Sequence, residues 1–178
     1  MKADPILMVT GHRRLNHREA VLVALGRVLE VVKPVLAIAG GANGTDDLFA
    51  GAAIRAQIPL WLIYPNIWYR RRYRISDRHP VHALRITYAV ERPMVCPNWR
   101  ARWNDERWWL DNFVRNGEMV GRSNVAAVVS DRSPRELLEA DTGGTAQCVK
   151  ALREGGHEKV LWVPDEPEAK VRPTRLVP

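Results

Sequence analysis

The feature that most constrains the fold of this chain is a regular alternation of short apolar runs and longer segments with helical periodicity. Apolar residues recur at helical spacing in the segments between the short runs. Strands that alternate with helices in this way form a parallel sheet covered by helices on both faces. The alternation therefore predicts an α/β three-layer sandwich with a mostly parallel sheet. The short runs are residues 5–10, 35–40, 59–65, 124–130 and 159–164.

After the third run the alternation is interrupted by residues 66–104, which are rich in arginine and aromatic residues. Between Trp68 and Arg107 the chain has ten arginines and four acidic residues, so this insertion carries most of the net charge of +7. "WYRRRYR" (68–74) could stack bases and pair with phosphates. Alternatively, its aromatic residues pack on the core and its arginines are solvated. "ALRITYAV" (83–90) predicts an additional strand.

These boundaries predict one domain over residues 1–164, with the insertion at about 66–104. Residues 165–178 are polar and proline-rich, and they predict a tail that is disordered or draped on the surface. No run reaches the roughly 18 apolar residues that a membrane span needs, and no signal peptide is recognisable. We therefore expect a cytoplasmic protein that does not enter a membrane.

Three glycine-containing turns follow three of the apolar runs, at residues 10–13, 40–46 and 142–145. In a parallel sheet such turns lie along one edge, where ligands bind. Glycine lets backbone N–H groups approach an anion, and the N-terminus of the following helix adds partial positive charge. Each turn by itself could equally be a tight connection between a strand and a helix. Their shared position favours one binding site for an anion.

Two common nucleotide-binding motifs are missing. "GGANGTDD" lacks the Gly-x-Gly-x-x-Gly spacing, and the chain has no Gly-Lys-[Ser/Thr] sequence. A standard dinucleotide dehydrogenase and a P-loop ATPase are therefore not expected. Cys96 and Cys148 have no metal-type spacing, so we expect neither a metal site nor a required cofactor.

Four motifs in chain order resemble the SLOG superfamily: "VTGHR", "AGGANGTD", "RNGEMVGRSNVAAVV" and "TGGT". This superfamily joins the DNA-processing protein DprA, the LOG phosphoribohydrolases and the YpsA-like proteins, and the chain looks closest to the YpsA-like branch. The resemblance covers about residues 5–163. It implies a Rossmann-like sheet whose glycine turns bind nucleotides or nucleotide-derived ligands.

The resemblance also implies roles for single residues. Gly40, Gly41, Gly44 and Asp46 match the glycine turn of the DprA and YpsA-like members, and Gly143, Gly144 and Thr145 match the second glycine turn. Arg115 and Met119 match the Arg-x-x-x-Met helix of the LOG enzymes, in which the arginine faces the ligand. The LOG enzymes carry a catalytic glutamate where this chain has Cys148. Phosphoribohydrolase activity is therefore not expected.

Two carboxylates are weak catalytic candidates. Asp46 could cap the following helix, accept hydrogen bonds from ribose hydroxyls or serve as an acid or base. Glu118 lies one helical turn from Arg115 and could simply form an ion pair with it. His12 could contact phosphate or hydrogen-bond to the backbone. The predicted ligand-binding residues are Thr10, Gly11, Arg13, Gly40, Gly41, Gly44, Thr45, Asp46, Arg115, Asn116, Gly143, Gly144 and Thr145.

The function that these residues predict is binding of a small anionic, nucleotide-derived ligand at the glycine turns. One alternative is an N-glycosidic hydrolase of the LOG type. A second alternative is DprA-like binding of single-stranded nucleic acid, which we expect to be weak and salt-sensitive. The sequence leaves the oligomeric state open, a homo-oligomer included.

Overall fold

The computed structural model describes residues 3–65, 84–89, 106–157 and 159–176. Their strands form one seven-stranded sheet in the order β4-β3-β2-β1-β5-β6-β7. All neighbours pair in parallel except β6 and β7, which are antiparallel. The strands are β1 Ile6–Gly11, β2 Leu36–Ala39, β3 Leu60–Tyr64, β4 Leu84–Tyr88, β5 Val125–Ser130, β6 Lys159–Pro164 and β7 Arg172–Arg175.

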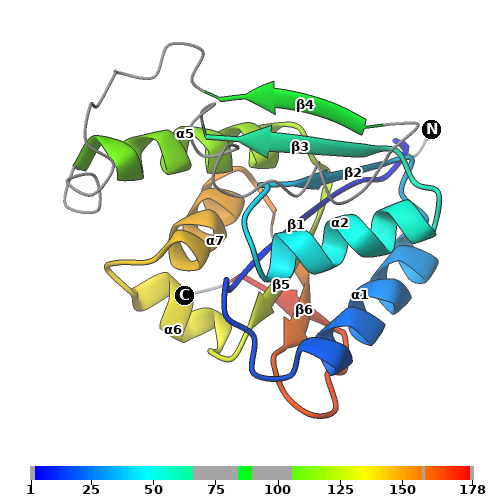
Figure 1. The fold of residues 1–178 in the computed structure, drawn as a ribbon. Coiled ribbons are helices and arrows are strands. Elements are labelled where there is room, and N and C mark those ends of the chain that lie inside the picture. The colour runs from blue at the N-terminus through cyan, green and yellow to red at the C-terminus, as the bar shows by residue number, and fades with distance from the viewer. Residues whose placement is uncertain (1–2, 66–83, 90–105, 158, 177–178) are drawn as a thin grey trace.

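Helices cover both faces of this sheet, as Figure 1 shows, with α1 and α2 on one side and α5 and α7 on the other. The predicted Rossmann-like three-layer fold with a mostly parallel sheet is thereby confirmed. No helix in the described part of the chain is long and apolar enough to cross a membrane. The helices are α1 Arg18–Val32, α2 Thr45–Arg55, α5 Glu106–Gly121, α6 Pro134–Glu139 and α7 Gly144–Glu154.

The central strand β1 is apolar on both faces because it is buried on both faces. Leu7 and Val9 pack into the cluster below α1 and α2, whereas Met8 packs into the cluster below α5 and α7. Alternate residues of a strand point to opposite faces, so one continuous apolar run supplies both cores. The N-terminal halves of the helices then lie near the carboxyl ends of the strands, where the glycine turns are.

The chain after β6 differs from its prediction. Residues 172–175 form β7, which pairs with β6, and Leu176 beyond it is 4% exposed. This stretch is therefore an ordered edge strand and not disordered, although three of its four residues are exposed on the surface. Pro173 is compatible with a strand here because β7 is at the edge of the sheet, where half of the backbone groups need no partner. The additional strand within "ALRITYAV" is confirmed as β4, and the rest of residues 66–104 lies outside the described residues.

The loop that leads into α1 is held by a residue far away in the sequence. The N-cap residue of α1 is His17, and no side-chain hydrogen bond caps the helix there. Instead, the carboxylate of Asp165 accepts hydrogen bonds from the backbone N–H groups of Asn16 and His17, both at 2.8 Å. Asp165 follows β6 directly and is 6% exposed. The loop between β1 and α1 is thus fixed to the end of another strand.

Candidate functional site

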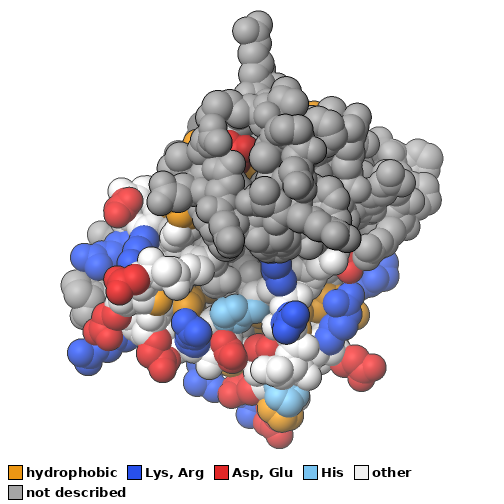
Figure 2. All heavy atoms as spheres, turned by 60° about the vertical axis from the view of Figure 1, so that its left-hand side comes forward, with side chains coloured by type: hydrophobic (Ala, Val, Ile, Leu, Met, Phe, Trp, Pro, Cys, Tyr) orange, Lys and Arg blue, Asp and Glu red, His pale blue; other side chains and the backbone are white. Residues whose placement is uncertain are grey.

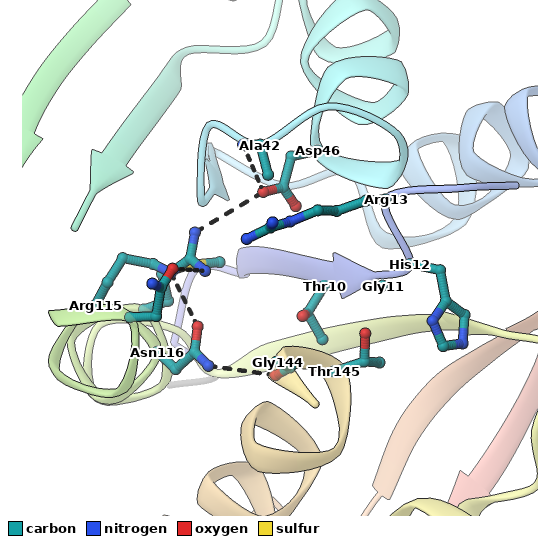
Figure 3. Close-up of a pocket in the computed structure, with 12 residues that line it drawn as sticks. Thr10, Gly11, His12, Arg13, Ala42, Asp46, Arg115, Asn116, Gly144 and Thr145 are labelled. Atoms are coloured by element: carbon teal, nitrogen blue, oxygen red, sulfur yellow. Dashed lines mark hydrogen bonds and ion pairs between the residues drawn. The ribbon is translucent and has the colours of Figure 1, made fainter. Parts of the chain in front are cut away.

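A cavity of about 250 Å³ opens at the carboxyl end of β1, between the starts of α2 and α7 and one side of α5. Figure 3 shows the residues around it. Eight of the predicted ligand-binding residues line it together: Thr10, Gly11, Arg13, Asp46, Arg115, Asn116, Gly144 and Thr145. Four lining residues were not among the predicted ones: His12, Ala42, Asn112 and Met119. The predicted residues that do not line it are Gly40, Gly41, Gly44, Thr45 and Gly143.

Arg115 is buried and holds the first glycine turn. Its Nη1 donates to the carbonyl oxygen of Gly40 at 2.7 Å, and its Nε donates to Oδ1 of Asn116 at 2.9 Å. Its Nη2 lies 3.5 Å from Oδ1 of Asn112. A Cβ atom on Gly40 would overlap this guanidinium, so the glycine is what lets Arg115 approach. Arg115 faces the pocket, but its three nitrogens already donate to Gly40 of the turn and to Asn112 and Asn116 of α5.

Asn116 extends this arrangement to the second glycine turn. Its Oδ1 accepts from Arg115, while its Nδ2 donates to the carbonyl oxygen of Gly144 at 3.4 Å. Two neighbouring residues of α5 therefore join the turn before α2 to the turn before α7. Figure 3 shows the bond from Asn116 to Gly144 and the ion pair of Arg115 with Asp46 as dashed lines. The "RN" pair of the sequence motif positions both turns of the site.

Asp46 is buried at the Arg115 side of the pocket. Its Oδ2 accepts a hydrogen bond from the backbone N–H of Ala42 at 3.0 Å and lies 3.9 Å from Nη1 of Arg115. Burial raises the pKa of this carboxyl, and the nearby Arg115 and the Ala42 N–H offset only part of that rise. The ion pair alone would suggest a lowered pKa, but 3.9 Å is long and the same nitrogen is committed to Gly40. We take burial as the stronger effect.

The cap of α2 also differs from the prediction. The N-cap residue is Gly44, and no side chain caps the helix, so neither Thr45 nor Asp46 has that role. The Thr45 hydroxyl donates to the carbonyl oxygen of His12 at 3.0 Å, and the Thr45 N–H donates to the same oxygen at 3.1 Å. The start of α2 is therefore tied to the loop that carries His12 and Arg13.

The second glycine turn presents an open helix N-terminus to the pocket. Gly144 begins α7, is exposed and lines the cavity, and no described atom lies within 4 Å of where its Cβ would be. Thr145 follows it and lines the same wall. Free N–H groups and the helix dipole make this position favourable for an anion.

His12 and Arg13 form the wall beyond the end of β1. Nε2 of His12 lies 2.9 Å from Oγ of Ser130 and 3.0 Å from Oδ1 of Asp131. His12 thus contacts side chains at the end of β5. The sequence suggests a hydrogen bond from its ring to the backbone as the alternative to a phosphate contact. Arg13 is exposed and lines the cavity, and its side chain points toward Asp46 and Arg115, as Figure 3 shows.

The weak catalytic candidate Glu118 lies away from the cavity, and the Cys148 thiol is inert. Oε2 of Glu118 pairs with Nε of Arg122 at 2.7 Å, so the expected partner Arg115 is wrong. Glu118 is not among the residues that line the pocket. Cys148 is fully buried, and burial raises its pKa to about 11, so the thiol stays protonated near neutral pH. Within the described residues, Asp46 is the carboxyl that faces the cavity.

Sequence comparison finds no matching family model and no matching curated protein. Comparison with solved structures finds DNA processing protein A from Helicobacter pylori, with a TM-score of 0.58 and 13% identity over 93% of this chain and 68% of that one. DprA from Streptococcus pneumoniae gives a TM-score of 0.59 and 15% identity over 90% of this chain and 50% of that one. At these identities the likeness concerns the fold, which this chain shares with the DprA proteins.

Proposed function

We propose that the cavity binds a phosphorylated ligand of about mononucleotide size. The observation that carries this proposal is the chemical asymmetry of its walls. His12, Thr145 and the N-terminus of α7 offer donors at one end, whereas at the other end Arg13 and Arg115 lie beside the buried carboxyl of Asp46. Binding sites for small molecules combine an enclosed volume with a few convergent polar groups of this kind.

The asymmetry favours one orientation of the ligand. A phosphate is stabilised beside Gly144 and Thr145, where the helix dipole and backbone N–H groups favour negative charge. The same phosphate would be repelled by the carboxylate form of Asp46, so a neutral hydroxyl-bearing part is better placed there. A sugar hydroxyl can donate to an Asp46 oxygen, as an acidic residue does in dinucleotide folds.

The volume favours a small ligand. Pockets for drug-sized ligands typically enclose about 300–1,000 Å³. The cavity of about 250 Å³ lies just below that range, so it suits a sugar phosphate or a mononucleotide with its base toward the rim better than a dinucleotide.

Calorimetric titration with AMP, ribose 5-phosphate and inorganic phosphate tests the proposal. Replacing Arg13 with glutamine should weaken binding of all three by about tenfold or more, because a charge-assisted contact contributes about 1.5–3 kcal/mol. Arg14→Gln is the matched control, because Arg14 is the neighbouring exposed arginine and does not line the cavity. Failure of all three ligands to bind at millimolar concentration would contradict the proposal.

Hydrolysis of an N-glycosidic bond is not what these walls favour. Proton transfer by a positioned acid typically contributes 10²–10⁴-fold to such a reaction, and the position of the LOG glutamate holds the buried Cys148. Incubation with AMP should therefore release little adenine. Rapid release would support the hydrolase alternative and assign the acid to Asp46, and an Asp46→Asn variant would then have to abolish it.

Binding of single-stranded DNA is a second candidate, favoured by one observation. The chain shares its fold with the Helicobacter pylori DprA protein, which binds single-stranded DNA. A strand could place one of its phosphates at the same end of the pocket. Titration of a fluorescent single strand at low and near-physiological salt separates the two functions, because each neutralised phosphate adds about 0.7 to the log–log salt slope.

We expect the single strand to bind weakly and in a salt-sensitive way, and we expect AMP to displace it. Tight binding at near-physiological salt that is lost when Arg70, Arg71, Arg72 and Arg74 become alanine would favour the nucleic-acid function instead. These four residues lie outside the described part of the structure, so the variant tests the sequence motif directly.

A further inference from the structure

The imidazole of His12 is held by one edge against the end of β5. Its Nε2 lies 3.0 Å from a carboxylate oxygen of Asp131 and 2.9 Å from Oγ of Ser130. An ionised carboxylate can only accept a hydrogen bond, so Nε2 must carry the hydrogen. Oγ of Ser130 also accepts from the backbone N–H of Arg132 at 3.0 Å, which fixes its position. The neutral ring therefore has its lone pair on Nδ1.

Nδ1 of His12 has no hydrogen-bond partner among the residues that the structure describes. The residue lines the cavity with a quarter of its side chain exposed. Figure 3 places its ring at the opposite end of the site from Arg115, beyond Gly11 and Thr145. The ring therefore lies on the side of the pocket where the proposed function puts the phosphate.

We infer that His12 takes up a proton when an anion occupies the pocket, and that the resulting Nδ1–H donates to that anion. This inference rests on the proposed function and adds a residue that selects for ligand charge. A lone pair on Nδ1 would repel a phosphate oxygen. An imidazolium has donors on both nitrogens, one for Asp131 and one for the ligand. Binding of the anion and binding of the proton therefore strengthen each other.

Several charged groups surround this end of the pocket. Asp131, which directly follows β5, favours the positive ring, whereas the side chain of Arg13 points away from the ring toward Asp46 and Arg115. Arg132 follows Asp131. Asp46 on α2 and Arg115 on α5 largely offset one another across the cavity. The carboxylate of Asp165 after β6 is occupied by two backbone N–H groups, and Cys148 on α7 is a neutral thiol.

The sign of the effect follows from this coupling. Histidine ordinarily changes charge between about pH 5 and pH 8. Where the free ring is neutral, anion binding has to take a proton from solution, so affinity falls by at most about tenfold per pH unit as pH rises. Where the ring is already charged, affinity is highest and no proton is taken up.

Calorimetry with sodium sulfate tests the inference, because sulfate does not titrate in this range. Titrations in buffers of different ionisation enthalpy give the number of protons taken up per sulfate bound. We expect net proton uptake on sulfate binding and a higher affinity at about pH 6 than at about pH 8. His12→Gln should bind sulfate more weakly, without proton uptake and without this dependence on pH.

Two further variants sharpen the test. Asp131→Asn removes the charge that favours the imidazolium, so the rise in affinity should move to lower pH. His17→Gln is the matched control, because His17 lies in the same loop and does not line the cavity, and it should leave proton uptake unchanged. Sulfate binding without proton uptake in the wild type would overturn this inference and leave the proposed function standing. If sulfate, inorganic phosphate and AMP all fail to bind, both are overturned.

Discussion

The glycine turn before α2 (residues 40–46, the first turn) and the one before α7 (residues 142–145, the second turn) occupy equivalent places in the fold. Their glycines nevertheless have different surroundings. Each turn precedes a helix that starts at the carboxyl edge of the sheet. In the first turn a Cβ on Gly41 would overlap the ring of Tyr64, and a Cβ on Gly44 would overlap the backbone of Arg13. In the second turn no described atom lies within 4 Å of a Cβ on Gly143 or Gly144. The first turn is buried, and the second is exposed.

This difference separates two uses of glycine. The first turn has more glycines and looks more like a phosphate cradle, but its glycines admit Arg115, Tyr64 and the β1–α1 loop into close contact. The second turn leaves open space at the N-terminus of α7, and Gly144 faces the cavity. A glycine-rich turn can therefore serve close packing in one place and ligand access in another, and substitutions distinguish the two.

The largest expected effect is that of Gly41→Ala. Gly41 has a φ of +72°, and its Cβ would enter the space of the buried Tyr64 ring. The left-handed backbone costs about 1–2 kcal/mol for a non-glycine residue, and overpacking adds about 1–3 kcal/mol. The free energy of unfolding should fall by about 2–5 kcal/mol in urea denaturation. This variant therefore tests the fold, and loss of ligand binding in it would not identify a phosphate contact.

Gly26→Ala is the control for this experiment. Gly26 lies inside α1, and no described atom is within 4 Å of its Cβ position. Alanine there should raise the free energy of unfolding by up to about 1 kcal/mol, because glycine is a poor helix former. If Gly41→Ala were as harmless as this control, the first turn would not be a packed one.

Gly143→Ala isolates the contribution of backbone strain to the free energy of unfolding. Its φ of +113° and ψ of 136° belong to a region that only glycine adopts readily, whereas its Cβ would meet no described atom. We expect a loss of about 1–3 kcal/mol from backbone strain alone. The measured difference between this variant and Gly41→Ala then estimates the packing term of the first turn. A loss as large as that of Gly41→Ala would remove the distinction between the turns.

The sequence predicts the sheet well because each buried strand can be recognised from its own residues. The parallel strands β1, β2, β3 and β5 are buried, so each has to be a continuous apolar run, and such runs are visible without any knowledge of their neighbours. The order of runs and turns likewise places Thr10, Asp46 and Thr145 near one another, since strand ends in a parallel sheet share an edge.

The sequence does not predict contacts that join distant parts of the chain. Asp165 accepts a hydrogen bond from the backbone of Asn16, 149 residues before it in the chain. Arg115 donates to the carbonyl oxygen of Gly40, 75 residues before it. Nothing in the local pattern around "DEPEAK" or "RNGEM" indicates these partners. The same holds for β7, whose polar residues suit an edge strand only because β6 is beside it.

Asp46→Asn tests how burial in the first turn affects the Asp46 carboxyl, through the pH dependence of the free energy of unfolding. Burial raises the pKa of Asp46 in the folded protein, so between its ordinary value and the raised one the folded state binds more protons than the unfolded state. Stability contributed by this group is therefore lost as pH rises through that interval, by at most about 1.4 kcal/mol per pH unit. Asparagine can still accept from the Ala42 N–H but cannot ionise.

Urea denaturation from about pH 4 upward measures this slope. The wild type should lose stability relative to Asp46→Asn as pH rises, and the two curves should run parallel once Asp46 is ionised in both states. The opposite divergence, with the wild type gaining on the variant, would mean that Arg115 dominates over burial. The first turn would then resemble a surface ion pair more than a buried one.

Gly144→Ala should have the smallest effect on stability and a clear effect on binding. An added methyl group would meet no described atom, so the free energy of unfolding should stay within about 0.5 kcal/mol of the wild type. The same methyl group would project beside the first N–H groups of α7, where the proposed phosphate approaches the backbone. Calorimetry should therefore show weaker binding of AMP and of inorganic phosphate.

Gly117→Ala on α5 is the matched control, because its Cβ also meets no described atom and Gly117 does not line the cavity. This variant should bind both ligands with unchanged affinity. Unchanged affinity in Gly144→Ala would place the phosphate away from α7 and would leave the openness of the second turn without a role in binding.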